Sequence, residues 1–180
     1  MYGIVNKAIE DLIISTFGEE KWEIIKQRSG VDIDFFISNE PYDDQITYNL
    51  AIEASNELKI PLSEVLHEFG EWWVLKTGKE KYGGLMEAGG ENLEEFLLNL
   101  PVFHSRIMLI YPRLTPPEFK ISNVGDKSVY VHYFSKRVGL QHFVEGLLVG
   151  LGKLYKTPVQ VEMIQSRDDG SDHEIFKVSW

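Results

Sequence analysis

Tyr133, Ser135 and Arg137 are the residues of this chain whose types and spacing point most clearly to a ligand. They alternate along residues 133–137, and alternate residues of an extended strand face the same side. Two hydroxyl groups and one guanidinium would therefore meet on one surface. A guanidinium can hold a carboxylate through two parallel hydrogen bonds, and the hydroxyls add further donors. The pattern predicts a carboxylate site, although a surface strand with incidental polar alternation would show the same spacing.

His104 is the second residue that suggests chemistry, because it falls on an apolar face of a predicted helix. The residues that share this face are Leu100, Ile107, Met108 and Tyr111. A histidine in such a setting is more often a satisfied core residue than a ligand. It can also be an axial metal ligand in a dry pocket.

The carboxylate site and the histidine together match one common ligand. Haem has a flat apolar macrocycle, two propionates and an iron that accepts a neutral imidazole. Pro117 would form a stiff corner between the helix of His104 and the strand of Tyr133. The combination favours a haem pocket more strongly than either feature does alone.

The order of helix and strand patterns along the chain predicts an α+β fold. A helical N-terminal part is followed by a small antiparallel sheet with an inserted helix. Haem would lie buried between the two parts. The predicted helices run from 4 to near 18, 22–30, 46–54 capped by Asp43 or Asp44, 61–73, 101–111 capped by Asn99 and stopped by Pro112, and 139–154. The predicted strands are 119–124, 128–134, 159–167 and 175–178. Glycines at 78, 83–84 and 89–90 predict breaks between short pieces.

The composition narrows the classes of function. With 180 residues, the chain is expected to form a single domain over 1–180. A net charge of −10 argues against nucleic acid and anionic lipid as partners. The absence of cysteine excludes disulfides, thiolate haem ligands and iron–sulfur clusters. Neither a signal peptide nor a membrane-spanning run is visible, which predicts a cytoplasmic protein with no membrane partner.

The other histidines and one acidic turn give weaker signals. His132 alternates to the strand face opposite Tyr133, and His173 lies near a turn. The acidic residues of this turn are Asp168, Asp169, Asp172 and Glu174. Their spacing matches no known cation-binding loop, so a solvated acidic turn is the expectation.

The chain resembles the haem nitric oxide/oxygen-binding (H-NOX) domains of bacterial gas sensors and soluble guanylate cyclase, being similar to the haem domain of the cyclase beta subunit and its cyanobacterial relatives. The resemblance covers the whole chain and is densest in residues 1–6, 99–104, 116–119 and 133–140. It implies haem b as the cofactor and His104 as the proximal iron ligand. It further implies that Tyr133, Ser135 and Arg137 bind the propionates. Pro117 would press on the porphyrin, while Ile4 and Trp73 line the pocket, with Trp73 on the distal side.

The distal position that faces the iron has two candidates, His142 and Phe143. Counting without gaps from Arg137 in the family pattern selects His142, whereas the run 139–146 and the downstream run 146–150 both select Phe143. Phe143 also shares a helix face with Leu147, and His142 lies about 100° away from it. We therefore expect Phe143 to face the iron, with His142 as the alternative.

The resemblance implies a sensor and not an enzyme. A phenyl ring at 143 offers no hydrogen-bond donor, and the Trp73 indole lacks a partner hydroxyl, so NO and CO are the expected ligands, with poor or no O2 binding. NO would weaken the bond to His104, free its helix and relax the haem that Pro117 presses. The signal would pass to a separate histidine kinase or cyclic-nucleotide enzyme. The alternatives are a peroxidase-like haem enzyme, for which only His142 could supply an acid–base group, and a haem carrier.

Overall fold

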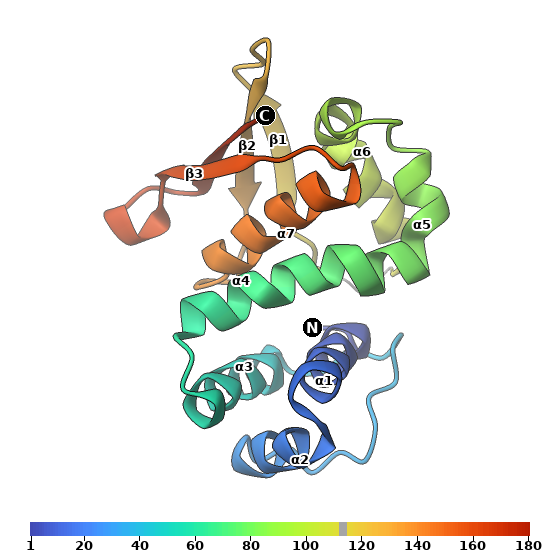
Figure 1. Cartoon of the computed structure of the whole chain (residues 1–180), viewed down its shortest axis with the longest axis vertical. Coiled ribbons are helices and arrows are strands. Elements are labelled where there is room, and N and C mark those ends of the chain that lie inside the picture. Colours follow the sequence, from blue (N-terminus) through green and yellow to red (C-terminus); the bar gives the residue numbers. More distant parts are fainter. Residues whose placement is uncertain (112–114) are drawn as a thin grey trace.

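The structure, a computed structural model, describes residues 1–111 and 115–180 and has the expected α+β class (Figure 1). The helical elements are α1 (Gly3–Phe17), α2 (Glu19–Arg28), α3 (Asp44–Leu58), α4 (Leu62–Trp72), η1 (Trp73–Gly78), α5 (Lys79–Glu87), α6 (Leu93–Ile110), α7 (Gln141–Leu154) and η2 (Arg167–Asp169). The strands are β1 (Glu118–Ser122), β2 (Ser128–Phe134), β3 (Gln160–Gln165) and β4 (Glu174–Ser179). They form an antiparallel sheet in the order β1-β2-β4-β3, so both predicted hairpins and the helix between them are confirmed.

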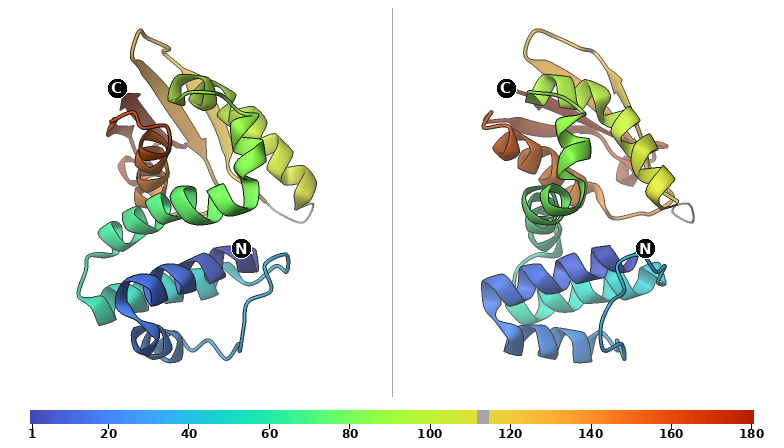
Figure 2. Two further views of the ribbon diagram at one scale, coloured as in Figure 1. Left: turned by 45° about the vertical axis from the view of Figure 1, so that its right-hand side comes forward. Right: turned by 90° about the vertical axis from the view of Figure 1, so that its right-hand side faces the viewer.

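The molecule has two apolar cores, one on either side of α4 (Figures 1 and 2). The first lies among α1, α2, α3 and α4, with Ile13, Ile25 and Leu50 almost fully buried. The second lies between the sheet and α5, α6 and α7. On β2, residues alternate between buried and half-buried, as a strand with one face on a core must. This alternation places Tyr133 on the inner face and His132 on the outer face.

Helices α4 and α7 approach each other backbone to backbone. A Cβ atom on Gly70 would overlap the carbonyl oxygen of Phe143, and one on Gly146 would overlap the carbonyl oxygen of His67. Only glycine permits this spacing, because any other residue would force the helices apart. The contact fixes the face of α7 that carries Phe143.

The break predicted at Gly78 and Gly83–Gly84 is wrong. Helix α4 continues through the π-helical segment η1 directly into α5, and both Gly83 and Gly84 lie inside α5. The apolar side chains of Tyr82 and Met86 are buried in the second core, and this packing outweighs the weak helix propensity of glycine. The π-helical segment begins at Trp73, and single π-helical turns often mark functional sites.

The predicted helix start at Asn99 is also wrong. Helix α6 begins at Leu93 and contains Pro101 in its interior. Its N-cap is Asn92, whose side chain accepts a hydrogen bond from the Glu95 amide at 3.0 Å. Asn99 instead donates to the Gly89 carbonyl oxygen at 2.9 Å. Asp43 caps α3 as predicted, whereas the stop assigned to Pro112 lies outside the described residues.

Within residues 1–111 and 115–180, no helix combines the length and the apolar character needed to cross a bilayer.

Candidate functional site

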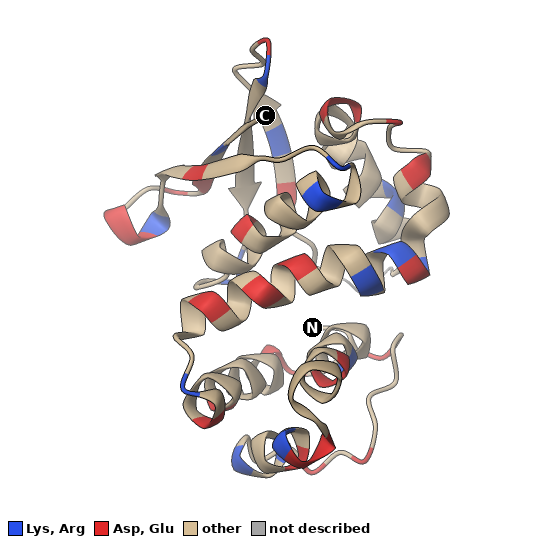
Figure 3. Ribbon diagram, in the orientation of Figure 1, with Lys and Arg blue, Asp and Glu red and all other residues tan. Residues whose placement is uncertain are grey.

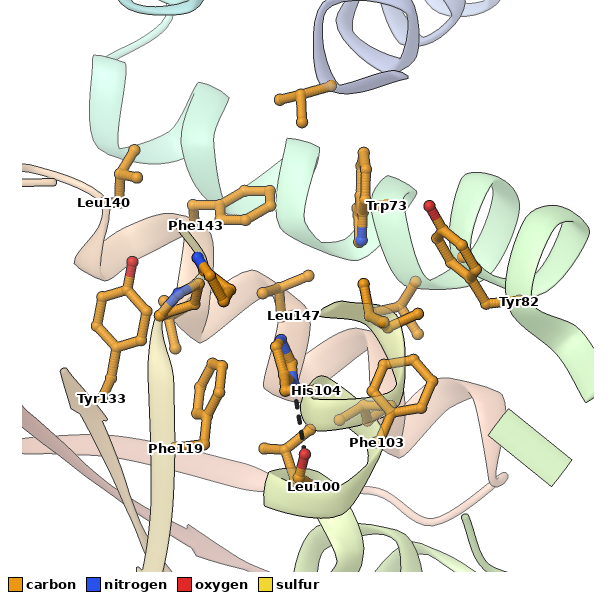
Figure 4. A pocket seen from close by; sticks show the side chains of 18 of the residues that line it. Trp73, Tyr82, Leu100, Phe103, His104, Phe119, Tyr133, Leu140, Phe143 and Leu147 are labelled. Atoms are coloured by element: carbon orange, nitrogen blue, oxygen red, sulfur yellow. Dashed lines mark hydrogen bonds between the residues drawn. The ribbon is translucent and has the colours of Figure 1, made fainter. Parts of the chain in front are cut away.

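An apolar cavity lies between the inner face of the sheet and the helices that cover it (Figure 4). Its empty volume is about 1360 Å³, a value that includes open solvent at its mouth. Aromatic and aliphatic side chains from both ends of the chain form its walls. Five residues expected to line a pocket do so here: Ile4, Trp73, Pro117, Phe143 and Leu147.

His104 projects from α6 into this cavity, against the ring of Phe119 at a centroid distance of 4.5 Å. Its Nδ1 lies 3.3 Å from the carbonyl oxygen of Leu100, which can only accept. The proton of the neutral ring therefore sits on Nδ1, and Nε2 keeps a lone pair. Figure 4 shows this second nitrogen directed away from Leu100, toward the cavity interior. Metal-binding histidines usually donate their other ring N–H to an oxygen in this way.

Burial keeps the imidazole of His104 neutral. It lowers the pKa of His104 to about 4, and the hydrogen bond to Leu100 opposes this shift only in part. A neutral ring is the form that binds iron.

The predicted helix face around His104 is right for three residues and wrong for one. Leu100, Ile107 and Tyr111 line the cavity, but Met108 is 45% exposed. The cavity lies on the Ile107 side of α6, and Met108 is about 100° further round the helix.

The three residues of the carboxylate site come together, but not on one strand. Strand β2 ends at Phe134, so Tyr133 belongs to the sheet while Ser135 and Arg137 lie in the loop that follows. The Ser135 hydroxyl accepts a hydrogen bond from the Arg137 amide at 3.1 Å and is hydrogen-bonded to the Tyr133 hydroxyl. Tyr133 and Arg137 line the cavity. A local side-chain turn, and not strand alternation, brings the donors together.

Asp44 holds the guanidinium of Arg137, a role that sequence reasoning missed. Arg137 Nε lies 2.7 Å from Asp44 Oδ2, Nη2 lies 3.2 Å from Oδ1, and Nη1 donates to the Thr115 carbonyl oxygen at 2.8 Å. The amino group of Met1 also contacts Asp44. Burial acts to raise the pKa of Asp44, but the bonds from Arg137 and the amino terminus outweigh it and lower that pKa. Three of the five guanidinium N–H groups are thereby used, which leaves two for a ligand.

A mostly buried ion pair holds the loop that follows β2. Arg167 Nε lies 2.7 Å from Glu174 Oε1, and its other two nitrogens donate to the carbonyl oxygens of Ser135 at 2.7 Å and Arg137 at 2.8 Å. Glu174 is only 2% exposed. The expectation of a solvated acidic turn is therefore wrong for Glu174, because this carboxylate pairs with Arg167.

The wall formed by α7 carries Phe143 and not His142. Phe143 lines the cavity and packs on Phe69 at a centroid distance of 5.0 Å. The Nδ1 of His142 instead lies 2.7 Å from Glu145 Oε2, one turn along the helix. The peroxidase-like alternative required His142 as an acid–base group in the cavity, and this contact gives it no support.

Tyr82 is a lining residue that sequence reasoning missed. Its hydroxyl donates to the Tyr111 hydroxyl at 2.8 Å. Burial, followed by this partner, raises the pKa of Tyr82. Tyr82 lies in a segment that the sequence analysis predicted to be short pieces separated by glycines, so no helical periodicity marked it as a lining residue.

The cavity fits haem in each part that this chain supplies. Its walls are apolar, a neutral imidazole projects from one of them, and the Tyr133 hydroxyl and the Arg137 guanidinium belong to residues that line it. His104, Tyr133 and Arg137 are the residues that would hold the group.

Comparisons with known proteins agree with this chemistry. The model of the Haem-NO-binding family matches residues 2–163. Soluble guanylate cyclase gcy-31 of Caenorhabditis elegans is 25% identical over 180 residues, covering 99% of this chain and 26% of the relative. Guanylate cyclase soluble subunit beta-2 of Rattus norvegicus is 28% identical over 123 residues, covering 65% of this chain and 18% of the relative. The chain thus spans about a quarter or less of these relatives.

Solved structures share the whole fold. An H-NOX protein from S. oneidensis in the Fe(II)NO ligation state has a TM-score of 0.89 at 17% identity, covering 99% of this chain and 98% of that one. The Fe(II) unliganded H-NOX protein from K. algicida has a TM-score of 0.86 at 20% identity, covering 99% and 96%. The family match and the fold together show that this chain belongs to the haem nitric oxide/oxygen-binding (H-NOX) family, whose members are haem-based sensor domains and not enzymes.

Proposed function

We propose that residues 1–180 form one sensor domain that binds haem b in the cavity and responds to NO and CO but not to O2. The proposal rests on one observation, the chemistry of the two cavity walls formed by α6 and α7. His104 directs a free nitrogen into the cavity from α6, and Phe143 lines the α7 wall without offering any polar atom. The bound haem would supply the iron that takes the gas.

The residues of the chain would hold haem by three kinds of contact. His104 Nε2 would bind the iron, with the Leu100 carbonyl keeping the required tautomer. Tyr133, Ser135 and Arg137 would donate to the propionates at the edge of the cavity. Pro117 would press on the macrocycle and Ile4 would line its pocket, and both residues line the cavity.

The choice of gas would follow from the donors that face the iron. A bound O2 carries displaced negative charge and gains from a hydrogen-bond donor, whereas NO and CO need none. Phe143 cannot donate, and the Tyr82 hydroxyl is already engaged by Tyr111. Figure 4 shows the nitrogen-bearing edge of Trp73 turned toward the cavity, with the hydroxyl of Tyr82 beside it, and this hydroxyl already donates to Tyr111.

The signal would begin with release of His104 and movement of α6. The His104 ring packs on Phe119 of β1, so a shift of α6 would reach the sheet. The Arg137–Asp44 pair ties the loop after β2 to α3, which gives a second route to the N-terminal helices. A sensor needs two states, and these contacts would carry the change between them from α6 to the sheet and the N-terminal helices.

The signal would pass in the cytoplasm to a histidine kinase or a cyclic-nucleotide enzyme. Curated relatives named as soluble guanylate cyclases support the second class.

A Phe143→Tyr variant tests the assignment of the gas-facing position. We expect the added hydroxyl to stabilise bound O2 by about 1.5–3 kcal/mol, which is roughly ten- to hundredfold in affinity. The reduced variant should show a reversible spectral change in air that the unaltered protein lacks. Phe143→Leu is the matched control and should not gain this change. If His142→Tyr gains it and Phe143→Tyr does not, the assignment of Phe143 is wrong.

A further inference from the structure

We propose a second binding site in this protein, for a divalent transition-metal ion, formed by His132 and His173 on the outer face of the sheet. His132 lies on β2 and faces away from the cavity, and His173 immediately precedes β4. The Nδ1 of His132 lies 2.9 Å from the Nε2 of His173. Neither histidine has a part in the proposed gas sensing, so the site goes beyond that function.

The separation of the two nitrogens suits a shared ion. Imidazole nitrogens bind zinc at about 2.0–2.1 Å, so two of them on one ion stand about 2.9 Å apart at a right angle and about 3.3 Å apart at the tetrahedral angle. The observed 2.9 Å falls at the lower end of this range. In the hydrogen bond the two nitrogens face each other, so both rings would turn on ion binding for their lone pairs to meet at one ion.

Each outer nitrogen has a partner of the kind that supports metal-binding histidines. His173 Nδ1 lies 2.6 Å from Asp172 Oδ1, and His132 Nε2 lies 2.7 Å from Ser122 Oγ. A carboxylate or hydroxyl on the far nitrogen fixes the tautomer and makes the ring a better ligand.

Metal binding at this site would require no net gain or loss of protons. Asp172 only accepts, so His173 carries its proton on Nδ1 and offers Nε2. In the metal-free state His132 then donates from Nδ1 to His173, and Ser122 donates to His132 Nε2. On metal binding, the His132 proton would move from Nδ1 to Nε2, and the Ser122 hydroxyl would turn from donor to acceptor. A hydroxyl can do both, so the serine suits either state.

The ring of His173 is packed against an aromatic side chain, and the turn beside it is exposed. Phe134 stacks on His173 at a centroid distance of 4.0 Å and an interplanar angle of 17°. The side chain of Asp172 is 83% exposed and that of His173 is 13% exposed, so an ion would reach the pair from the side of this turn. Lys120 is the nearby cation, with its Nζ 4.8 Å from the centre of the Phe134 ring, and its charge would weaken but not block ion binding.

A second group of ligand-type residues lies on α4, a helix with several acidic positions (Figure 3), but it is less suited to an ion. The candidate atoms of His67, Glu68 and Glu71 lie within 4.8 Å of one another. The Glu71 carboxylate is already paired with the ammonium group of Lys153, which an ion would have to displace. The contacts of His132 and His173 with Ser122, Asp172 and Phe134 include no ammonium group that an ion would have to displace.

Two neutral imidazoles define the class of ion. They suit Cu²⁺, Zn²⁺ and Ni²⁺, with water completing the coordination, whereas Mg²⁺ and Ca²⁺ prefer oxygen ligands.

Titration of the tag-free, haem-loaded protein with Zn²⁺ against a coloured chelator tests the site. We expect one Zn²⁺ per chain, tighter binding of Cu²⁺ and none of Mg²⁺ in competition. His132→Asn and His173→Asn should each abolish one-to-one binding. Asp172→Asn should weaken it by about 10- to 100-fold, and its exposed position leaves the fold unchanged. His142→Asn and His67→Asn are the matched controls and should bind as the unaltered protein does.

Three results would overturn the proposal: no binding at one equivalent, unchanged binding in the His132→Asn/His173→Asn double variant, or loss of binding in His67→Asn. Electron paramagnetic resonance of the Cu²⁺-loaded protein gives a readout that does not depend on variants. It should report two nitrogen ligands, and a spectrum with oxygen ligands alone would contradict the site.

Discussion

A His104→Gly variant is expected to lose the absorption spectrum of ferrous haem held by a histidine, and to regain it when imidazole is added to the solution. The variant removes the imidazole that α6 directs into the cavity and leaves a space of its own size. Free imidazole can enter this space and bind the iron, but it is no longer joined to α6. We therefore expect restored ligation without the conformational response of α6 to NO.

The control for this variant is His142→Gly, whose ring contacts Glu145 and should leave the spectrum unchanged. A ferrous spectrum that is the same in His104→Gly as in the unaltered protein would contradict the assignment of the iron ligand.

Glu174→Gln should cost the protein about 3–5 kcal/mol of unfolding free energy, the usual cost of removing one partner of a buried ion pair. The change leaves the mostly buried Arg167 guanidinium without its counter-charge. Since Arg167 also holds the carbonyl oxygens of Ser135 and Arg137, haem should dissociate faster as well. Urea unfolding and haem transfer to an apo acceptor measure the two effects.

Asp169→Asn, at an exposed position in the same turn, is the matched control and should change stability by no more than about 0.5 kcal/mol. Equal effects of the two substitutions would show that the Arg167–Glu174 pair does not support the loop.

Local patterns were enough to predict most of the secondary structure. The alternation on β2, the cap at Asp43 and the Asp169–Gly170 turn act over a few residues, so the sequence displays them. The interior proline of α6 and the two glycines of α5 could not be placed this way. Their conformation depends on packing in the second core and on the N-cap at Asn92, which override local preference.

The same contrast between local patterns and long-range contacts applies to the site. His104 could be found from its apolar helix face, and the resemblance to a family indicated the residues opposite it. The contacts of Arg137 with Asp44 and of Arg167 with the loop join segments far apart in the chain. No short pattern encodes such pairs, and the arrangement of Ser135 and Arg137 in a loop instead of a strand was missed for the same reason.

The absorption spectrum of the reduced protein, recorded alone and then with NO, with CO and in air, decides whether this domain senses the gases assigned to it. We predict a spectrum of histidine-ligated ferrous haem that changes with NO and with CO, and no stable oxygen complex in air. A protein that takes up no haem, or one that forms a stable oxygen complex, would contradict the proposal.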